Sequence, residues 1–395
     1  MLANKLPFAP GQDNDLFNSV PAASAVFLVR SDEPEAEPYV SKSANLRRRL
    51  LRLLGASDER SRKLNLRERA RWIEYTLTGS DFESGLLLYN VLRSCFPKTY
   101  SARLRLRPPA LLRIHMDNPY PRASITRRVG RLDDLANYYG PFPSRAVAEK
   151  FANDVLDFFK MRRCVEDLNP DPAFPGCIYS EMKMCLAPCF KGCSDGEYRA
   201  EVGRVHAFLQ TKGESLVREI SDQRDQASNN LDFENAAAIH ARVEKLKPLL
   251  NQLPEIVHPL NRLSAVIIQK SAQPESATLF RIDAGAIAGP STLSFQQQLV
   301  PGGKSPSMES RVQAALASLP AFLPGSRVQL MEHLAILKRW YFRGTRAGEI
   351  FFADEKGVLP IRRIVRGIAR VYRGEQPDSQ LPAASMMENS NPGVQ

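Results

Sequence analysis

The sequence predicts an α+β protein made of several domains. Segments with the period of amphipathic helices occur together with short alternating runs typical of strands. The chain has 395 residues, which is too long for one ordinary core, and its 43% apolar and 25% charged residues are typical of globular proteins. No apolar run approaches the roughly twenty residues of a membrane span. We therefore expect a protein of about two to four domains without a membrane segment.

The N-terminal part is expected to form a small α/β domain over residues 21–105, after a disordered tail over residues 1–20. The tail is rich in Pro, Asn, Asp and Gln and shows no periodicity. A strand is predicted over residues 24–29, a second strand starts at Tyr39, and a basic helix covers residues 45–54. The leucines of this helix recur at helical spacing, so one face is expected to pack while its arginines face outward.

A second helix of this domain is expected to begin at Asp81. Asp is a good N-cap residue, and Pro97 is expected to end the helix. Cys95, near the end of its apolar run, is most simply a buried helix residue.

Positive charge gathers in this part of the chain. Lys and Arg outnumber Asp and Glu by 54 to 43, which gives a net charge of +11. The densest arginines follow Asn45 and continue to Arg113. A basic surface attracts polyanions because each neutralised phosphate releases counterions, so nucleic acid is the expected partner. A solvated helix face is the alternative interpretation.

Five of the six cysteines lie between residues 164 and 193. Such clustering indicates a metal centre, and the first four are the candidate ligands: Cys164, Cys177, Cys185 and Cys189. Converging thiolates suit zinc or an iron–sulfur cluster, and the spacing does not choose between them. Cys193 is a substitute ligand or a bystander. A disulfide with buried thiols is the alternative, but the N-terminus does not resemble a signal peptide, so we expect a reducing cytoplasm.

A connector over residues 106–205 is expected to carry this cysteine region, and a helical hairpin should follow over residues 206–254. Its two main helices are predicted over residues 213–228 and 232–253. One face presents a large aromatic residue beside two small ones: Phe233, Ala236 and Ala237. This face suits docking against a similar hairpin of a partner, and an internal helical pair is the alternative.

Beyond Pro254 the pattern changes to alternation, which predicts a β-rich domain with one or two helices over residues 255–375. Asp283, Asp354 and Glu355 are interpreted as turn and strand-edge carboxylates. A further basic stripe, a candidate second DNA contact, consists of Arg362, Arg363, Arg366, Arg370 and Arg373 with Tyr372. Residues 376–395 have the composition of a disordered tail.

Five segments in order resemble the UvrC family, the C subunit of the bacterial excinuclease ABC. They are Y-V-S-K-S-A-N-L-R-R-R-L from Tyr39, E-S-G-L-L-L-Y-N-V-L from Glu83, Y-Y-G-P-F from Tyr138, C-L-A-P-C from Cys185 and L-D-F-E-N-A-A from Leu231. The resemblance implies a GIY-YIG-like nuclease domain, a cysteine cluster region and a UVR hairpin in nucleotide excision repair. Of the family's C-terminal half, the resemblance covers only the opening, so a shortened relative is expected.

The resemblance also implies roles for particular residues. Tyr39 and Arg49 match the tyrosine and arginine of the family's nuclease site, where arginine suits a phosphate because its guanidinium can contact two oxygens. The four candidate cysteines match ligands of a [4Fe–4S] cluster. The implied partners are damaged DNA and a UvrB-like helicase subunit, which the hairpin would meet. Mg²⁺ or Mn²⁺ is expected only if the nuclease is active.

The chain departs from the family pattern at the nuclease site. Leu88 stands where the family has the glutamate that holds the metal, Ser41 replaces a glycine, and Ser101 replaces an asparagine. Residues 25–27 lack the first motif's tyrosine. We therefore expect a degenerate site whose remaining cations can still bind DNA: Lys42, Arg47 and Arg48. An active excinuclease subunit cutting beside a lesion, and a zinc-ribbon nucleic-acid binder, are the alternatives.

Overall fold

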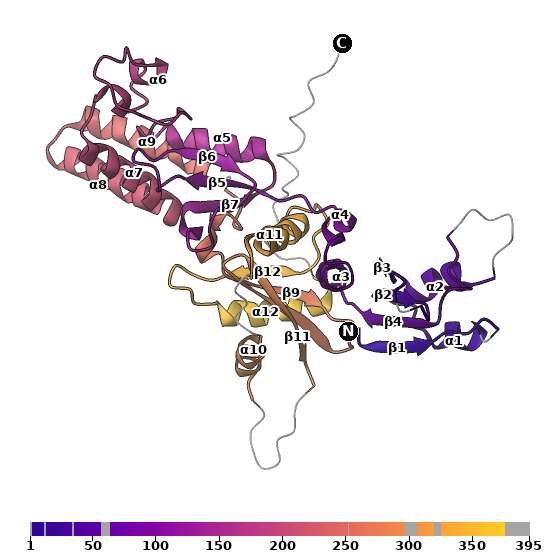
Figure 1. The fold of residues 1–395 in the computed structure, drawn as a ribbon. Helices are drawn as coiled ribbons and strands as arrows, with labels where there is room; N and C mark the ends of the chain where they lie inside the picture. The colour runs from indigo at the N-terminus through magenta and orange to yellow at the C-terminus, as the bar shows by residue number, and fades with distance from the viewer. Residues whose placement is uncertain are drawn as a thin grey trace, which may run out of the picture.

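The structure, a computed structural model, describes residues 2–11, 13–33, 35–56, 64–251, 253–296, 306–319 and 325–375. These residues form antiparallel four-stranded sheets surrounded by helices (Figure 1), so the predicted α+β class is confirmed. The expected tail over residues 376–395 lies outside the described part of the chain. Among the described helices, none combines the length and the apolar character needed to cross a membrane.

The N-terminal sheet has the strand order β1-β4-β2-β3. Its strands are β1 (Asn4–Pro7), β2 (Ala25–Arg30), β3 (Tyr39–Ser43) and β4 (Trp72–Leu77), accompanied by α1 (Asp13–Ser19) and α2 (Leu46–Leu54). The predicted strands at β2 and β3 and the predicted basic helix are confirmed. Asn45 caps α2 by accepting a hydrogen bond from the Arg48 backbone N–H. The face that α2 buries consists of Leu46, Leu50, Leu53 and Leu54.

Residues 1–20 correct the expectation of a disordered tail. β1 pairs with β4 at the edge of the sheet, in a register that places Pro7 opposite Trp72. Phe8 and Phe17 are buried in the core of the N-terminal sheet. Because most of the segment is polar, its few apolar side chains were not predicted to be core residues. Their burial against the sheet orders the chain.

Helix α3 (Asp81–Cys95) begins at Asp81 as predicted, but its N-cap is Ser80 and not Asp81: the Ser80 side chain accepts from the Glu83 backbone N–H. Its buried face packs on the C-terminal part of the protein. The ring of Phe82 lies 5.0 Å from that of Phe280, measured between centroids, and the Tyr89 hydroxyl donates to Glu332 at 2.9 Å. At the same time α3 contacts strands β2 and β3. α3 therefore belongs to both units.

The middle sheet has the order β6-β5-β7-β8. Its strands are β5 (Ala110–Ile114), β6 (Ala123–Thr126), β7 (Tyr138–Phe142) and β8 (His258–Pro259). The helices of this part are α4 (Tyr100–Leu104), α5 (Arg145–Leu156), the short α6 (Ile178–Glu181) and α7 (Asp195–Gln210), with 3₁₀ turns at Leu135–Asn137, Pro188–Phe190 and Leu260–Arg262. Since β8 follows the hairpin in sequence, the last strand of this sheet comes from beyond the hairpin.

The predicted helical hairpin consists of α8 (Glu214–Asn229) and α9 (Phe233–Asn251), which pack along each other. Leu216, Ile220, Val243 and Leu246 are buried and attach the base of the hairpin to the main core. In Figure 1 the hairpin and the cysteine region lie at the opposite end of the molecule from the N-terminal sheet.

The C-terminal sheet has the order β11-β10-β9-β12. Its strands are β9 (Ala265–Lys270), β10 (Ser276–Asp283), β11 (Ala286–Ser294) and β12 (Glu349–Phe352), and its helices are α10 (Met308–Ala317), α11 (Arg327–Tyr341) and α12 (Ile361–Arg373). The predicted basic stripe lies on α12, but Arg370 forms a two-pronged ion pair with buried Glu349 at 2.8 and 2.6 Å. Arg362, Arg363 and Arg366 remain exposed.

Candidate functional site

The tyrosine and arginine predicted for a nuclease site are in direct contact. Tyr39 lies on β3 and Arg49 on α2, and the Arg49 Nη2 donates to the Tyr39 hydroxyl at 2.7 Å. The Tyr39 ring packs near Phe27, with centroids 6.1 Å apart. The Arg49 Nε is buried and has no hydrogen-bond partner within the described residues. A buried guanidinium N–H without an acceptor is costly, and a phosphate oxygen would satisfy it.

The carboxylates nearest to α3's start already have partners. Asp81 forms ion pairs with Lys42 at 2.5 Å and with Arg343 at 2.6 Å. Burial alone would raise the pKa of Asp81, but Lys42 and Arg343 outweigh burial and leave that pKa below its usual value. Glu83 accepts from the Gly79 backbone N–H at 2.8 Å, and burial raises the pKa of its carboxyl. Leu88, half-buried on the same helix, offers no ligand atom.

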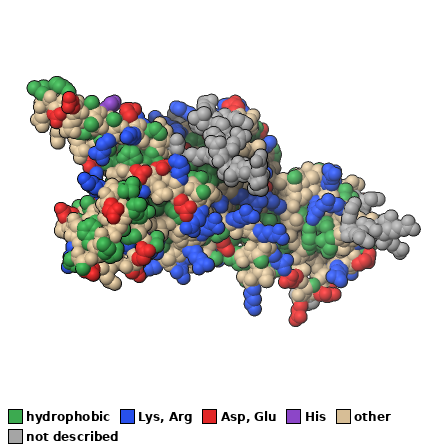
Figure 2. Space-filling view, turned by 90° about the horizontal axis from the view of Figure 1, so that it is seen from above, with side chains coloured by type: hydrophobic (Ala, Val, Ile, Leu, Met, Phe, Trp, Pro, Cys, Tyr) green, Lys and Arg blue, Asp and Glu red, His purple; other side chains and the backbone are tan. Residues whose placement is uncertain are grey.

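The three basic side chains predicted to bind DNA differ in their contacts and in their exposure. Lys42 is held by Asp81, and Arg48 is exposed on α2. Arg47 donates to the backbone carbonyls of Val20 and Asn18 at 2.8 and 3.1 Å, so it fastens α2 to the end of α1. Figure 2 shows Lys and Arg side chains gathered across the middle of one face. Positive charge is therefore concentrated on that face of the molecule.

The four predicted cysteine ligands lie close enough to influence one another electrostatically. Burial first, and then the neighbouring thiols of Cys164, Cys189 and Cys177, raise the pKa of Cys185 to about 11. Burial also raises the pKa of Cys189, with Cys177 and Cys164 contributing. Cys185 and Cys189 are therefore protonated at neutral pH, and binding a cation there must release their protons. Within the described residues, no group of three or more His, Cys, Asp or Glu side chains has the arrangement of a single-ion site.

The backbone around these cysteines turns tightly. Lys183, Ala187 and Lys191 adopt left-handed conformations that non-glycine residues rarely take, with φ of 56°, 57° and 58°, and Gly176 has φ of 89°. The Ala187 backbone N–H points at the Cys185 sulfur, 3.3 Å away. Such N–H donors stabilise thiolates more than thiols. The loop is therefore shaped to turn sulfur atoms and their donors inward.

A buried arginine beside the cysteines was missed by the sequence analysis. Arg162 is only 1% exposed, and its Nε donates to the Tyr120 carbonyl at 2.8 Å while its Nη1 donates to the Glu166 carbonyl at 2.8 Å. The same Nη1 lies 3.4 Å from the Cys164 sulfur. Among the described residues, the acceptors of the Arg162 guanidinium are backbone carbonyls, the Asn118 amide oxygen and that sulfur, and none of them is a carboxylate that would balance the charge. A buried cation is stabilised by a nearby anion, and thiolates would supply it.

The tip of the hairpin exposes the residues predicted to dock. Phe233 is 64% exposed and Ala237 is exposed, while Ala236 is half-buried. Leu231, which the sequence analysis did not select, is 73% exposed beside them and has a left-handed φ of 61°. An isolated large apolar pair at a hairpin tip is typical of an interaction site.

Two family models match parts of this chain. Residues 110–208, which contain strands β5, β6 and β7 of the middle sheet and the cysteine loop, match the family described as UvrC/Cho excinuclease, middle domain. Residues 214–247, which form the hairpin, match the UvrB/uvrC motif. This pair of matches places the chain among proteins that resemble the middle part of an excinuclease subunit. The similarity to the UvrC family that was predicted from the sequence is confirmed.

Curated relatives are named UvrABC system protein C. The protein of Methanothermobacter thermautotrophicus is 26% identical over 68% of this chain and 45% of its own length. That of Trichlorobacter lovleyi is 31% identical over 56% of this chain and 36% of its own length. The Acetivibrio thermocellus protein is 23% identical over 83% of this chain and 52% of its own length. The chain thus spans about half or less of these relatives. No solved structure matches.

Proposed function

We propose that this chain is a DNA-binding and partner-binding subunit of nucleotide excision repair whose phosphodiester-cutting site has lost its metal ligand. One observation carries the proposal. An intact Tyr39–Arg49 pair, 2.7 Å apart, stands beside a helix on which Leu88 replaces the expected glutamate and both nearby carboxylates are engaged.

The chemistry supports binding without cutting. Arg49 is only partly buried, so its guanidinium can donate to a phosphate, since phosphate contacts need charge and no metal. Hydrolysis by this kind of site needs a divalent cation, and Mg²⁺ is usually held by one or two carboxylates. Asp81 could serve only by leaving Lys42 and Arg343, whose positive charges also repel a metal ion.

The test is incision of an end-labelled duplex with one lesion, in Mg²⁺ or Mn²⁺, with the other repair subunits present. We expect the wild-type chain to shift the duplex in a binding assay and to leave it uncut. Arg49→Ala should weaken that binding because it removes a phosphate donor. Cleavage that disappears in Tyr39→Phe would refute the proposal and establish the second candidate.

The second candidate is an active excinuclease subunit, which the preserved Tyr39–Arg49 contact favours. It would need Asp81 or Glu83 to hold the metal. Asp81→Asn and Glu83→Gln decide this point, because either change should abolish cutting if that carboxylate is the ligand and should change nothing if the wild type does not cut.

We further propose that Cys164, Cys177, Cys185 and Cys189 hold a [4Fe–4S] cluster, with zinc as the alternative. The mutual influence of the four thiols, the inward Ala187 N–H and the unbalanced charge of Arg162 support this assignment. When bound, the group supplies a cross-link between the segments that carry the cysteines. The cysteines contribute thiolates and Arg162 contributes a compensating positive charge.

Cys185→Ser is expected to remove the bound metal and, for an iron–sulfur cluster, the broad visible absorption of anaerobically purified protein. Cys193→Ser is the matched control and should keep both, because Cys193 is influenced by Glu197, Asp195 and Cys189 but by no other thiol of the set. Iron and zinc analysis of each variant distinguishes the two metals. Equal loss of metal in both variants would contradict the choice of ligands.

Phe233→Ala is expected to weaken binding to a UvrB-type partner hairpin by about 2 kcal/mol, roughly thirtyfold in Kd, because an exposed aromatic anchor is a typical hot spot. Isothermal titration measures the change. Phe174→Ala is the control, since Phe174 is also exposed (44%) but lies in the cysteine loop. If both variants bind like the wild type, the hairpin tip is not the docking site.

A further inference from the structure

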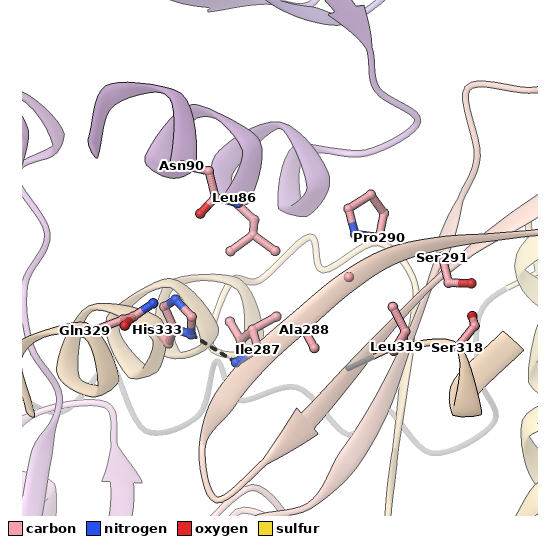
Figure 3. A pocket seen from close by; sticks show the side chains of 11 residues that line it. Leu86, Asn90, Ile287, Ala288, Pro290, Ser291, Ser318, Leu319, Gln329 and His333 are labelled. Atoms are coloured by element: carbon pink, nitrogen blue, oxygen red, sulfur yellow. Dashed lines mark hydrogen bonds between the residues drawn. The ribbon is translucent and has the colours of Figure 1, made fainter. Parts of the chain in front are cut away.

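A cavity of about 420 Å³ opens between α3, the strand β11 and α11 (Figure 3). Its inner wall is well buried, with Leu86 and Ile287 each 3% exposed and His333 2% exposed. Its rim is accessible, because Asn90 on α3 and Pro290 within β11 are exposed. The cavity is therefore a pocket with a solvent-facing mouth rather than a packing defect.

Among the described residues, those that line the pocket carry polar groups but include no Asp, Glu, Lys or Arg. Figure 3 shows the carboxamides of Asn90 and Gln329 and the imidazole of His333 on one side, and the hydroxyls of Ser291 and Ser318 on the other. Burial, helped by the charge of Arg93, lowers the pKa of His333 to about 4. Its Nδ1 accepts from the Ile287 backbone N–H at 3.0 Å, so the neutral ring carries its proton on Nε2.

The remaining surfaces are apolar and face each other. Leu86 points into the pocket from α3, while Ile287 and Ala288 form the opposite side on β11 (Figure 3). A charged ligand would lose its hydration here without meeting a counter-charge. A flat, uncharged ligand with donors and acceptors on its edge would lie between the apolar surfaces and reach the amides and hydroxyls around it.

We propose that this pocket receives a single nucleobase extruded from bound DNA. Nucleobases have the required size, flatness, neutrality and edge of donors and acceptors, and proteins that take a base out of a duplex hold it by edge hydrogen bonds and apolar stacking. The inference rests on the proposed DNA binding and adds a base-binding role for α3 and β11, away from the Tyr39–Arg49 pair.

The mouth of the pocket is also suited to the strand that would carry the base. Arg93 lies three residues after Asn90 on α3, on an adjacent part of the same helix surface. Its Nη1 lies 3.3 Å from the Tyr89 hydroxyl, and its charge is felt at His333 inside the pocket. A phosphate bound at Arg93 therefore places the attached nucleotide next to the opening, while the phosphate itself stays outside the uncharged interior.

The test uses a duplex with 2-aminopurine opposite an abasic analogue, because the fluorescence of this base rises when it leaves the stack. Wild-type protein should raise the fluorescence several-fold on binding. Asn90→Trp should fill the mouth and abolish the rise, while anisotropy shows that the duplex is still bound. Ser94→Trp, with an exposed residue one turn further along α3, is the matched control and should behave like the wild type.

Asn90→Leu adds a second variant that keeps the side-chain size and removes its hydrogen bonds, and it should reduce the rise without blocking entry. Binding of the duplex without any fluorescence rise overturns the pocket inference and leaves the proposed function standing. Absence of duplex binding overturns both. Saturable binding of free 2-aminopurine nucleoside, lost in Asn90→Trp, with no response of the duplex would assign the pocket to free nucleosides and overturn the DNA assignment.

Discussion

Replacing Arg162 with methionine is expected to lower the free energy of unfolding by on the order of 3–5 kcal/mol. Methionine fills a similar volume, but it leaves the carbonyl oxygens of Tyr120 and Glu166 without the donor that the buried Arg162 side chain provides. It also removes the positive charge next to the Cys164 sulfur. Urea unfolding, followed by far-UV circular dichroism, measures the loss.

Arg163→Met is the matched control for this substitution. Arg163 is the next residue, and its Nη2 forms an ion pair at 2.7 Å with Asp157, whose side chain is 57% exposed. A pair open to water on one side contributes at most about 1 kcal/mol. Equal losses in the two variants would show that Arg162 has no special electrostatic role beneath the cysteines.

Introducing glutamate at Leu88 is expected to create cutting. A metal held by a carboxylate supplies several kcal/mol to phosphodiester hydrolysis, so Leu88→Glu should incise a lesion-containing duplex at least about a hundredfold faster than the wild-type chain. The Tyr39–Arg49 pair is already in place and needs no rebuilding. A denaturing gel of the end-labelled strand, run over a Mg²⁺ series, measures the rate.

Two comparisons make the outcome specific. Leu87→Glu places the same charge one position earlier, about 100° round the helix, and should not cut. Tyr39→Phe combined with Leu88→Glu should lose the new activity. If Leu88→Glu folds and binds DNA but does not cut it, the absence of a carboxylate at residue 88 is not the reason that the wild-type chain does not cut.

Local pattern was enough to predict β2, β3, α2 and the hairpin, because their apolar spacing agrees with the faces that they bury. It failed at β1 and α1, because the burial of Phe8 after β1 and of Phe17 in α1 outweighs the polar composition of this segment. The Tyr39–Arg49 contact came only from the family resemblance, since nothing in the spacing joins a strand residue to a helix residue. Arg162 was missed because nothing in the sequence of a basic chain distinguishes a buried arginine from an exposed one. Its position two residues before the predicted ligand Cys164 was the one feature that could have indicated its role.

The partition of α3 between two units has a practical consequence for anyone dissecting the protein. A fragment cut after residue 105 would keep the whole N-terminal sheet and yet present Phe82, Leu86 and Tyr89 to water. Burial of each of these side chains contributes about 1.5–3 kcal/mol to stability. The fragment would therefore expose a contiguous apolar surface and should self-associate. The boundary between the two units therefore runs along helix α3 and does not fall at a single peptide bond of the chain.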